Sequence, residues 1–442
     1  MKRLSFILAL GACCVGRFAE AITLDAALAR TLEHNPAIQA ERLALEQASG
    51  RRLVLRSLMW PDVRLNAVAG DQGGKRAGED SNQPFGFARG FFTQPLFNAA
   101  IPASNRRGDI EVLLAQQRLV AATVTQLHAA RLAFYTTLYN RSLVTLAEGQ
   151  RQRLAANVAT ETEKYRAGHG GRDPIAAARV VEGELNPRIE TARRAQDGAI
   201  LTLAQLMGDE LGSNAALPNP EGELRMTPGD LDFETNAAIA LSRRADVQVA
   251  RLLVRAAGED ERIVQAGYYP LIAATISGDY IPISGIRRGS EGSPRRSDDI
   301  ISSEVRFGAA YTWRVIDNGK VGGQVAQRRA IREMNKLLLQ KVEADAAREI
   351  AVAEARLRAV GSSEQALGRA GAAAEKNVGL VQQNLAQGLT SQLEFRNAET
   401  AFLQAQTARL SLAYEQNVAR AEYDRASGRY FQFSGDTTHK PD

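Results

Sequence analysis

The stretch NPAIQAERL, Asn35 to Leu43, is repeated later in the chain as RADVQVARL, Arg244 to Leu252. The two copies stand about 210 residues apart, so the repeat is long enough to be a complete structural unit. The same register aligns further pairs: Trp60-Pro61 with Tyr269-Pro270, Gln94 to Asn98 with Trp313 to Asp317, and Tyr165 to Gly168 with Leu385 to Gly388. Because the matched segments keep one order, the chain consists of two tandem copies of one unit.

The duplication predicts the domain organisation. We expect residues 1–21 to be a signal peptide, 22–208 the first repeat, 209–232 an inter-repeat linker, 233–429 the second repeat and 430–442 a C-terminal tail. Each repeat should contain a helix, two strands, a very long helix, a glycine turn and a shorter helix. The expected helices are Leu24 to Leu58, Ala103 to Arg166, Pro174 to Met207, Phe233 to Gly267, Lys320 to Ala386 and Gln392 to Gly428.

The composition favours an elongated molecule. A chain of 442 residues exceeds the size at which one compact core keeps growing, and only 6% of it is aromatic. Apolar residues of the second long helix, such as Ile350, Ala353 and Leu357, recur every three or four positions, which predicts supercoiled packing. Each long helix of roughly 65 residues spans about 100 Å, and the two shorter helices of a repeat sum to a similar length. Four helical columns per chain are therefore expected.

Charge and histidine placement exclude several functions. Arginines alternate with acids along the predicted helices, which is typical of a solvated face, so no nucleic-acid partner is expected. The four histidines, His34, His128, His169 and His439, have no spacing that makes a zinc site. His169, at the first glycine turn, is either a pH sensor or an exposed turn residue. No phosphate loop and no nucleophile elbow occur, so we expect neither an enzyme nor a cofactor.

The first residues have the pattern of an export signal. Lys2 and Arg3 precede an apolar stretch, and Ala19 and Ala21 supply small residues for cleavage. A second interpretation stays open, in which Cys13 ends a lipobox and becomes a lipidated first residue. With cleavage after Ala21 both cysteines are removed, and the mature chain has no disulfide.

Two pairs of strands are predicted: Pro61 to Gly70 with Phe85 to Phe97, and Leu271 to Ile281 with Glu304 to Ile316. In the last strand Val305, Phe307 and Tyr311 point one way, while Arg306 and Arg314 point the other. This alternation indicates a strand with lipid on one side and water on the other. A half-buried hairpin of a soluble protein gives the same pattern, but its occurrence in both repeats favours the membrane interpretation.

A polar, glycine-rich loop is expected between the strands of each pair, at Asp71 to Pro84 and at Pro282 to Ser302. These segments are too charged to enter lipid, so they should be external loops. The second loop carries four arginines: Arg287, Arg288, Arg295 and Arg296. Two interpretations stay open, namely contact with anionic phosphates of the outer-membrane lipid and simple solvation.

Assembly follows from the number of strands. After the leader no run of about 18 apolar residues can form a spanning helix, so a membrane span must be a closed barrel of the outer-membrane type. Four strands cannot close a barrel, because the smallest known membrane barrels use about eight. Three chains give twelve strands and leave a lumen. We expect a mainly α fold with a membrane β-barrel portion, in which a homotrimer builds a 12-stranded barrel and an α-helical tunnel of long coiled-coil hairpins.

The opening ITLDAAL, Ile22 to Leu28, is followed by Asn35-Pro36, a strand start at Pro61, the strand end QPLF and two glycine turns. In these features the chain resembles the TolC-type outer-membrane efflux proteins, the outer membrane factor family. The resemblance implies a trimer in the outer membrane of a Gram-negative cell, with a tunnel that reaches into the periplasm. It also implies a passive duct that docks a periplasmic adaptor (membrane fusion) protein and an inner-membrane pump or a type I secretion ABC transporter.

The resemblance further implies a gate at the periplasmic turns, Gly168 and Gly388. The family's acidic constriction matches Asp173 in the first repeat and Glu394, with Asn397 one turn later, in the second. Asn397 stands where family members often have an aspartate, which implies a less acidic ring. Ordinary helix N-terminal chemistry explains Asp173 and Glu394 equally well.

One competing hypothesis is a secreted structural coiled-coil protein whose hairpins mediate contacts without a channel. The strand pairs argue against it, because a soluble coiled coil has no use for lipid-facing aromatic residues. The sequence does not identify the exported substrate, which is a drug, a metal ion or a protein, nor the adaptor and pump.

Overall fold

The computed structural model describes residues 21–76, 79–168, 171–210, 217–226, 237–280 and 303–429. Residues 1–20 of the predicted signal peptide, the tail, His169 and the second predicted loop with its four arginines lie outside these residues. The chain divides into two compact units. Unit 1 comprises Met1–Glu41, Leu119–Ala245 and Ala344–Asp442, and unit 2 comprises Arg42–Arg118 and Asp246–Glu343.

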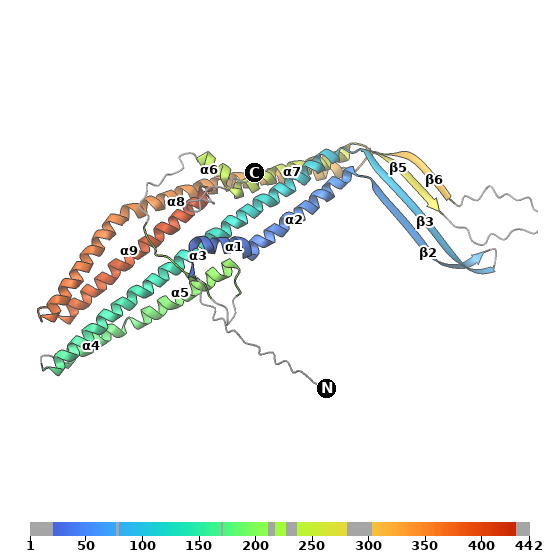
Figure 1. Ribbon diagram of the computed structural model, residues 1–442. Helices are drawn as coiled ribbons and strands as arrows, with labels where there is room; N and C mark the ends of the chain where they lie inside the picture. The colour runs from blue at the N-terminus through green and yellow to red at the C-terminus, as the bar shows by residue number, and fades with distance from the viewer. Residues whose placement is uncertain are drawn as a thin grey trace, which may run out of the picture. The chain divides into compact units, whose positions relative to one another are not determined.

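The helices and long strands follow one another in the same order twice (Figure 1). The first series is α1 (Leu24–His34), α2 (Pro36–Arg56), η1 (Ser57–Met59), β2 (Asp62–Arg76), β3 (Glu79–Phe97), α3 (Ala100–Arg166), α4 (Arg172–Gly183) and α5 (Asn186–Met207). The second is α6 (Ala237–Arg243), α7 (Ala245–Gln265), η2 (Ala266–Tyr268), β5 (Leu271–Tyr280), β6 (Ser303–Thr312), α8 (Lys320–Ala386) and α9 (Gln392–Ala426). The predicted fold class is confirmed in its order of elements; the boundaries of the five parts stay predictions.

Three helices predicted to be continuous are interrupted. The first breaks at Asn35, since the following Pro36 disfavours helical torsions at the residue before it, and Asn35 has φ −62 and ψ 123. The Asn35 carboxamide oxygen then accepts from the backbone N–H of Ala37 at 2.9 Å and so caps α2. The equivalent helix of the second repeat breaks at Arg244, and the shorter helix of the first repeat breaks at the turn between α4 and α5.

The long strands form one antiparallel sheet in unit 2, in the order β2-β3-β5-β6. The prediction of a loop conformation over Asp71 to Pro84 is wrong, because the β2–β3 ladder continues from the pair Asp71 and Pro84 to the pair Arg76 and Glu79. Small and polar residues lower strand propensity without interrupting backbone pairing. The last strand ends at Thr312, four residues before the predicted end at Ile316.

The start of α8 has a local cause. Asp317 accepts from the backbone N–H groups of Gly319 at 3.0 Å and Val321 at 2.7 Å, which caps the helix that follows β6. These two bonds lower the pKa of the Asp317 carboxyl below its usual value, the Val321 bond contributing most. The carboxylate therefore stays charged at neutral pH, as a helix N-terminus favours.

Large apolar side chains on the sheet are exposed in the single chain. Leu65 on β2 is 76% exposed and Phe307 on β6 is 77% exposed, and Val63, Val305 and Tyr311 are exposed with them. Separately, no helix among the described residues is both long and apolar enough to cross a membrane.

Unit 2 also contains ion pairs that hold α7 against its neighbours. Arg106 and Arg107 of α3 contact Glu259 and Asp260 of α7, each pair at 2.9 Å. On α8, Arg332 contacts Glu261 at 2.9 Å, and the Glu261 side chain is buried. Glu259 and Glu261 are buried, and buried carboxylates need such partners, so their ion pairs favour α3 and α8 as the neighbours of α7.

In unit 1, each repeat closes on itself at the end of its last helix. In the first repeat, the Asn35 amide donates to the carbonyl of Leu206 in α5 at 2.8 Å. In the second, the Arg244 guanidinium donates to the carbonyl of Ala426 in α9 at 3.3 Å. A left-handed glycine follows each helix, Gly208 with φ 78 and Gly428 with φ 75. We call these two junctions the repeat closures.

Candidate functional site: the two glycine turns

Both predicted glycine turns are present in unit 1. Gly168, after α3, has φ 76, and Gly388, after α8, has φ 72, and a side chain added at either position would meet open space. Left-handed backbone is strained for residues other than glycine, so the glycines are needed for their conformation and not for close packing. The backbone N–H of Gly388 donates to Leu385 at 3.2 Å and that of Gly168 donates to Tyr165 at 3.0 Å.

The second turn leads into a helix with a complete cap. The Ser391 hydroxyl accepts from the backbone N–H of Glu394 at 3.2 Å, and the Glu394 carboxylate accepts from the backbone N–H of Ser391 at 3.0 Å. This reciprocal pair is a capping box, and the Thr390 hydroxyl adds a third bond at 3.0 Å. The Ser391 N–H bond, followed by the Thr390 bond, lowers the pKa of the Glu394 carboxyl, so Glu394 is an exposed anion at neutral pH.

The first turn leads into a helix without a side-chain cap. Gly171 occupies the capping position of α4, and Asp173 lies in the first helical turn, exposed. Arg172 donates to the Tyr165 hydroxyl at 3.0 Å across the turn. Asn397, one turn beyond Glu394 on α9, is exposed as well. The structure thus places Asp173 and Glu394 in equivalent first turns, and no contact joins these two described side chains.

Each glycine turn joins two helices into a hairpin, α3 with α4 and α8 with α9. An ion pair with a buried glutamate connects the two hairpins, and sequence reasoning missed it. Arg153 of α3 donates to both carboxylate oxygens of Glu399 on α9, at 3.0 and 3.1 Å. The Glu399 side chain is only 1% exposed. Nearby, Gln150 donates to the Glu399 carbonyl at 3.2 Å and Asn157 donates to Gln392 at 2.9 Å. One glutamate among many on an alternating helix gives no sequence signal of burial.

Two further contacts lie closer to the turns. Lys164 of α3 donates to the carbonyl of Leu385 at 3.3 Å, next to the second turn. Arg396 of α9 contacts Glu184 at 3.0 Å, where the chain passes from α4 to α5. The two turns are therefore held by polar contacts between the hairpins as well as within them.

An apolar cluster fills the space behind these contacts: Leu154, Leu185, Ile189, Leu385 and Phe395. Beside it lies a cavity of about 310 Å³ whose lining includes Ala178 and Val181 of α4 and Phe395 of α9. At its rim Val180 is 60% exposed and Leu393 is 64% exposed. This apolar opening between α4 and α9 is large enough to take side chains from another molecule.

Residues 237–429 match the family model described as outer membrane efflux protein. Over these residues, which lie in the second repeat, the chain is similar to the outer membrane efflux proteins. The resemblance seen in the sequence is confirmed by this match, and the family is one of efflux proteins and not of enzymes. A search of curated proteins finds no match.

Solved structures extend the fold to nearly the whole chain. The CmeC channel of Campylobacter jejuni is 14% identical and has a TM-score of 0.79, with 94% of this chain and 87% of that chain covered. VceC of Vibrio cholerae is 18% identical, has a TM-score of 0.75 and covers 92% and 96% of the two chains. The MtrE channel of Neisseria gonorrhoeae is 18% identical, with a TM-score of 0.72 and coverage of 92% and 88%. At these identities the similarity shows the fold, so the chain has the fold of these outer-membrane channels.

Proposed function

We propose that three copies of this outer membrane efflux protein assemble into a passive export duct through the outer membrane of a Gram-negative cell, with the helices reaching into the periplasm. The observation that carries the proposal is the four-stranded sheet. Its edge strands, β2 and β6, each pair on one side only among the described strands, and its apolar side chains are exposed. Unpaired edges are not tolerated in lipid, and neighbouring copies can satisfy them by closing a barrel.

The assembly state provides the first test. The detergent-solubilised full chain should have the mass of three protomers, and reconstituted protein should conduct ions across a planar bilayer. Trimer formation brings 3 copies of 4 strands, a number that leaves a lumen. A monomer without conductance, or recovery in the soluble periplasm without detergent, would favour the secreted coiled-coil alternative instead.

The two turns form the periplasmic gate of this duct, with Asp173, Glu394 and Asn397 at its constriction. Supporting this assignment, Asp173 and Glu394 occupy the first turns of α4 and α9, both are exposed, and the Glu394 carboxyl has a lowered pKa. Three Glu394 carboxylates, one from each copy, would attract multivalent cations from the periplasmic side.

Conductance measurements test the gate directly. Glu394→Ala should weaken block by multivalent cations about tenfold or more, whereas Glu33→Ala, which removes an exposed carboxylate from α1, should leave block unchanged. Because the pKa of Glu394 is lowered, wild-type block should persist as the pH falls from 7 to about 5. Unchanged block in Glu394→Ala would assign Glu394 to helix capping alone.

Docking of a periplasmic adaptor would use the apolar cavity between α4 and α9. Exposed Val180 and Leu393 at its rim support this, since an adaptor hairpin could lay its apolar stripe there. The adaptor would connect the duct to an inner-membrane pump or to a type I secretion ABC transporter, which supplies the energy. Identifying that adaptor and its pump would determine the exported substrate class.

A further inference from the structure

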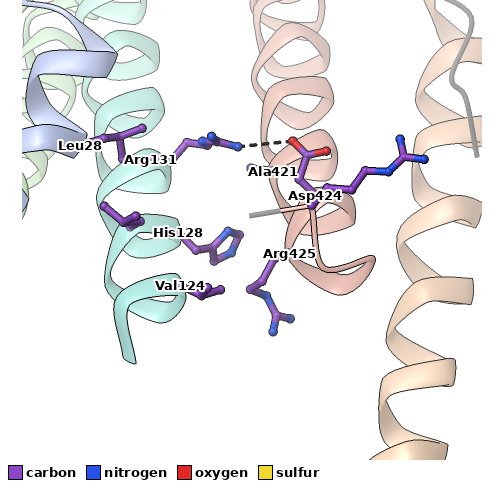
Figure 2. Close-up of a pocket in the computed structure, with 9 residues that line it drawn as sticks. Leu28, Val124, His128, Arg131, Ala421, Asp424 and Arg425 are labelled. Atoms are coloured by element: carbon purple, nitrogen blue, oxygen red, sulfur yellow. Dashed lines mark hydrogen bonds and ion pairs between the residues drawn. The ribbon is translucent and has the colours of Figure 1, made fainter. Parts of the chain in front are cut away.

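A small pocket lies between α3 and α9 in unit 1, far along both helices from the glycine turns. Figure 2 shows His128 and Arg131 of α3 pointing toward Asp424 and Arg425 of α9, with Leu28 and Val124 beside them. Arg429, just after α9, completes the polar lining. We call this site the basic pocket. None of these residues belongs to the proposed gate.

The guanidinium groups of Arg131 and Arg425 are only partly engaged. Arg131 contacts Asp424 through one nitrogen at 3.4 Å, a long distance for a charged pair. Arg425 contacts Glu349 at 3.3 Å, but that same carboxylate oxygen already accepts from Arg244 at 2.9 Å. A guanidinium group has five N–H donors, so each arginine has further N–H groups that can donate to a ligand in the pocket.

His128 supplies a third polar group to the pocket. Among the described residues its imidazole makes no hydrogen bond. Burial, and then the charge of Arg425, lower its pKa to about 4, with Arg131 acting in the same direction and Glu422 opposing it. The ring is therefore neutral at pH 7 and offers one N–H donor without adding charge.

The carbonyl groups at the end of α9 do not compete for these donors. The backbone N–H groups of Ser427 and Arg429 donate to Tyr423 and Asp424 carbonyls, both at 2.8 Å, and Arg244 donates to the Ala426 carbonyl at 3.3 Å. The last turn of α9 is thus satisfied internally. Burial raises the pKa of the Asp424 carboxyl, which indicates that this one acid is poorly stabilised in its charged form.

The size of the pocket limits what can enter it. Its volume is about 30 Å³, and a water molecule needs about 10–15 Å³ by this measure. A pocket of this size takes a halide ion or the head of a carboxylate group. We propose that the basic pocket binds a small monovalent anion, a chloride ion or a carboxylate group, held by Arg131 and Arg425 with His128 as a further donor.

Chloride itself is the probe for the test. The ³⁵Cl NMR signal of sodium chloride should broaden in the presence of the detergent-solubilised full chain, because bound chloride relaxes rapidly and exchanges with the bulk. Arg131→Gln and Arg425→Gln should each remove at least half of the excess linewidth. Arg409→Gln, which changes an exposed arginine on the same helix α9, is the matched control and should keep the wild-type linewidth.

Competition in the wild type keeps the test decisive if a variant fails to fold. Sodium acetate at constant ionic strength should displace chloride and narrow the line, whereas gluconate, whose carboxylate carries a bulky hydroxylated chain, should displace chloride less. The acetate concentration that displaces half of the bound chloride shows whether the pocket prefers a carboxylate group or chloride. Equal linewidths for wild type, Arg131→Gln and Arg425→Gln, or equal effects of acetate and gluconate, would overturn the proposal and leave a pocket filled by water.

Discussion

The two repeats of this protein agree at their closures and differ at their turns. In both, the residue at the break of the first helix donates to a carbonyl near the end of the last helix, Asn35 to Leu206 and Arg244 to Ala426. In contrast, α4 starts from Gly171 without a side-chain cap, whereas α9 starts from a capping box at Ser391.

The difference extends along the two shorter helices. After α4 the first repeat breaks again before α5, while α9 continues without interruption from Gln392 to Ala426. Capping and continuity both stabilise a helix, so the second hairpin should be the stiffer of the two. The two copies therefore share the repeat closure and differ at the turns that we propose as the gate.

The largest effect is expected at the closures. In Gly208→Ala the new Cβ would lie 2.4 Å from the carbonyl oxygen of His34, and in Gly428→Ala it would lie 2.8 Å from the Arg243 Cβ. Added to the left-handed backbone strain, this clash should lower the free energy of unfolding by about 3 kcal/mol in each repeat. Denaturant unfolding followed by circular dichroism measures it. Gly198→Ala, inside α5 with open space around it, is the control and should be neutral or stabilising; equal losses at all three positions would contradict the clash.

Breaking the ion pair between the two hairpins should have the next largest effect. Arg153→Met leaves the buried Glu399 carboxylate without its partner and should cost about 2 kcal/mol of stability. The double variant Arg153→Met with Glu399→Leu should recover most of the loss, because it removes both charges. Arg396→Met, which breaks the exposed pair with Glu184, should cost less than about 1 kcal/mol. Additive losses in the double variant would show that the pair is not coupled.

Removing the cap of the second hairpin should have a moderate effect. Ser391→Ala deletes the acceptor for the Glu394 N–H and should destabilise α9 by about 1 kcal/mol. Hydrogen exchange of the first turn of α9 should accelerate, while the first turn of α4 should be unaffected. Ser391→Thr keeps the acceptor and serves as the control, and exchange as fast as in Ser391→Ala would argue against the cap.

Adding a cap to the first hairpin should have the smallest effect. Gly171 has φ −94 and ψ 175, a capping conformation that serine adopts, and a Cβ there would meet only an ordinary contact at 3.7 Å. Gly171→Ser should stabilise α4 by about 0.3 kcal/mol and make the stability of its first turn more similar to that of α9. Slower hydrogen exchange in α4 measures it; a destabilised variant would mean that the turn requires glycine.

Periodic features were predictable from the sequence because they repeat. Heptad spacing located α8, strand alternation located the last strand of the sheet, and the duplication located both turns. The breaks at Asn35 and Arg244 were not predicted, because the apolar pattern runs on through them. The β2–β3 strand pair was predicted, but its extension over Asp71 to Pro84 was missed because the Gly, Asn and Ser residues there suggested a loop, while the backbone ladder continued.

The glycine turns were predictable, whereas contacts that depend on burial were hidden. Gly168 and Gly388 were found because a glycine turn has a local signature. Asp173 and Glu394 were assigned from the family resemblance, and their role at a constriction stays a prediction. The pair Arg153 and Glu399 joins residues 246 positions apart, and the sequence holds many arginines and glutamates that look the same. Only the packing of α3 against α9 selects this pair from the others.

The repeat closures also constrain the order in which the chain can fold. Asn35 and Leu206 are separated by 171 residues, and Arg244 and Ala426 by 182. At a synthesis rate of about 5–20 residues per second, the partner carbonyl emerges on the order of ten seconds or more after the first helix. During that interval the first helix of each repeat lacks the carbonyl that it contacts in the folded chain. The repeat closures therefore form only after the last helix of the repeat has been made.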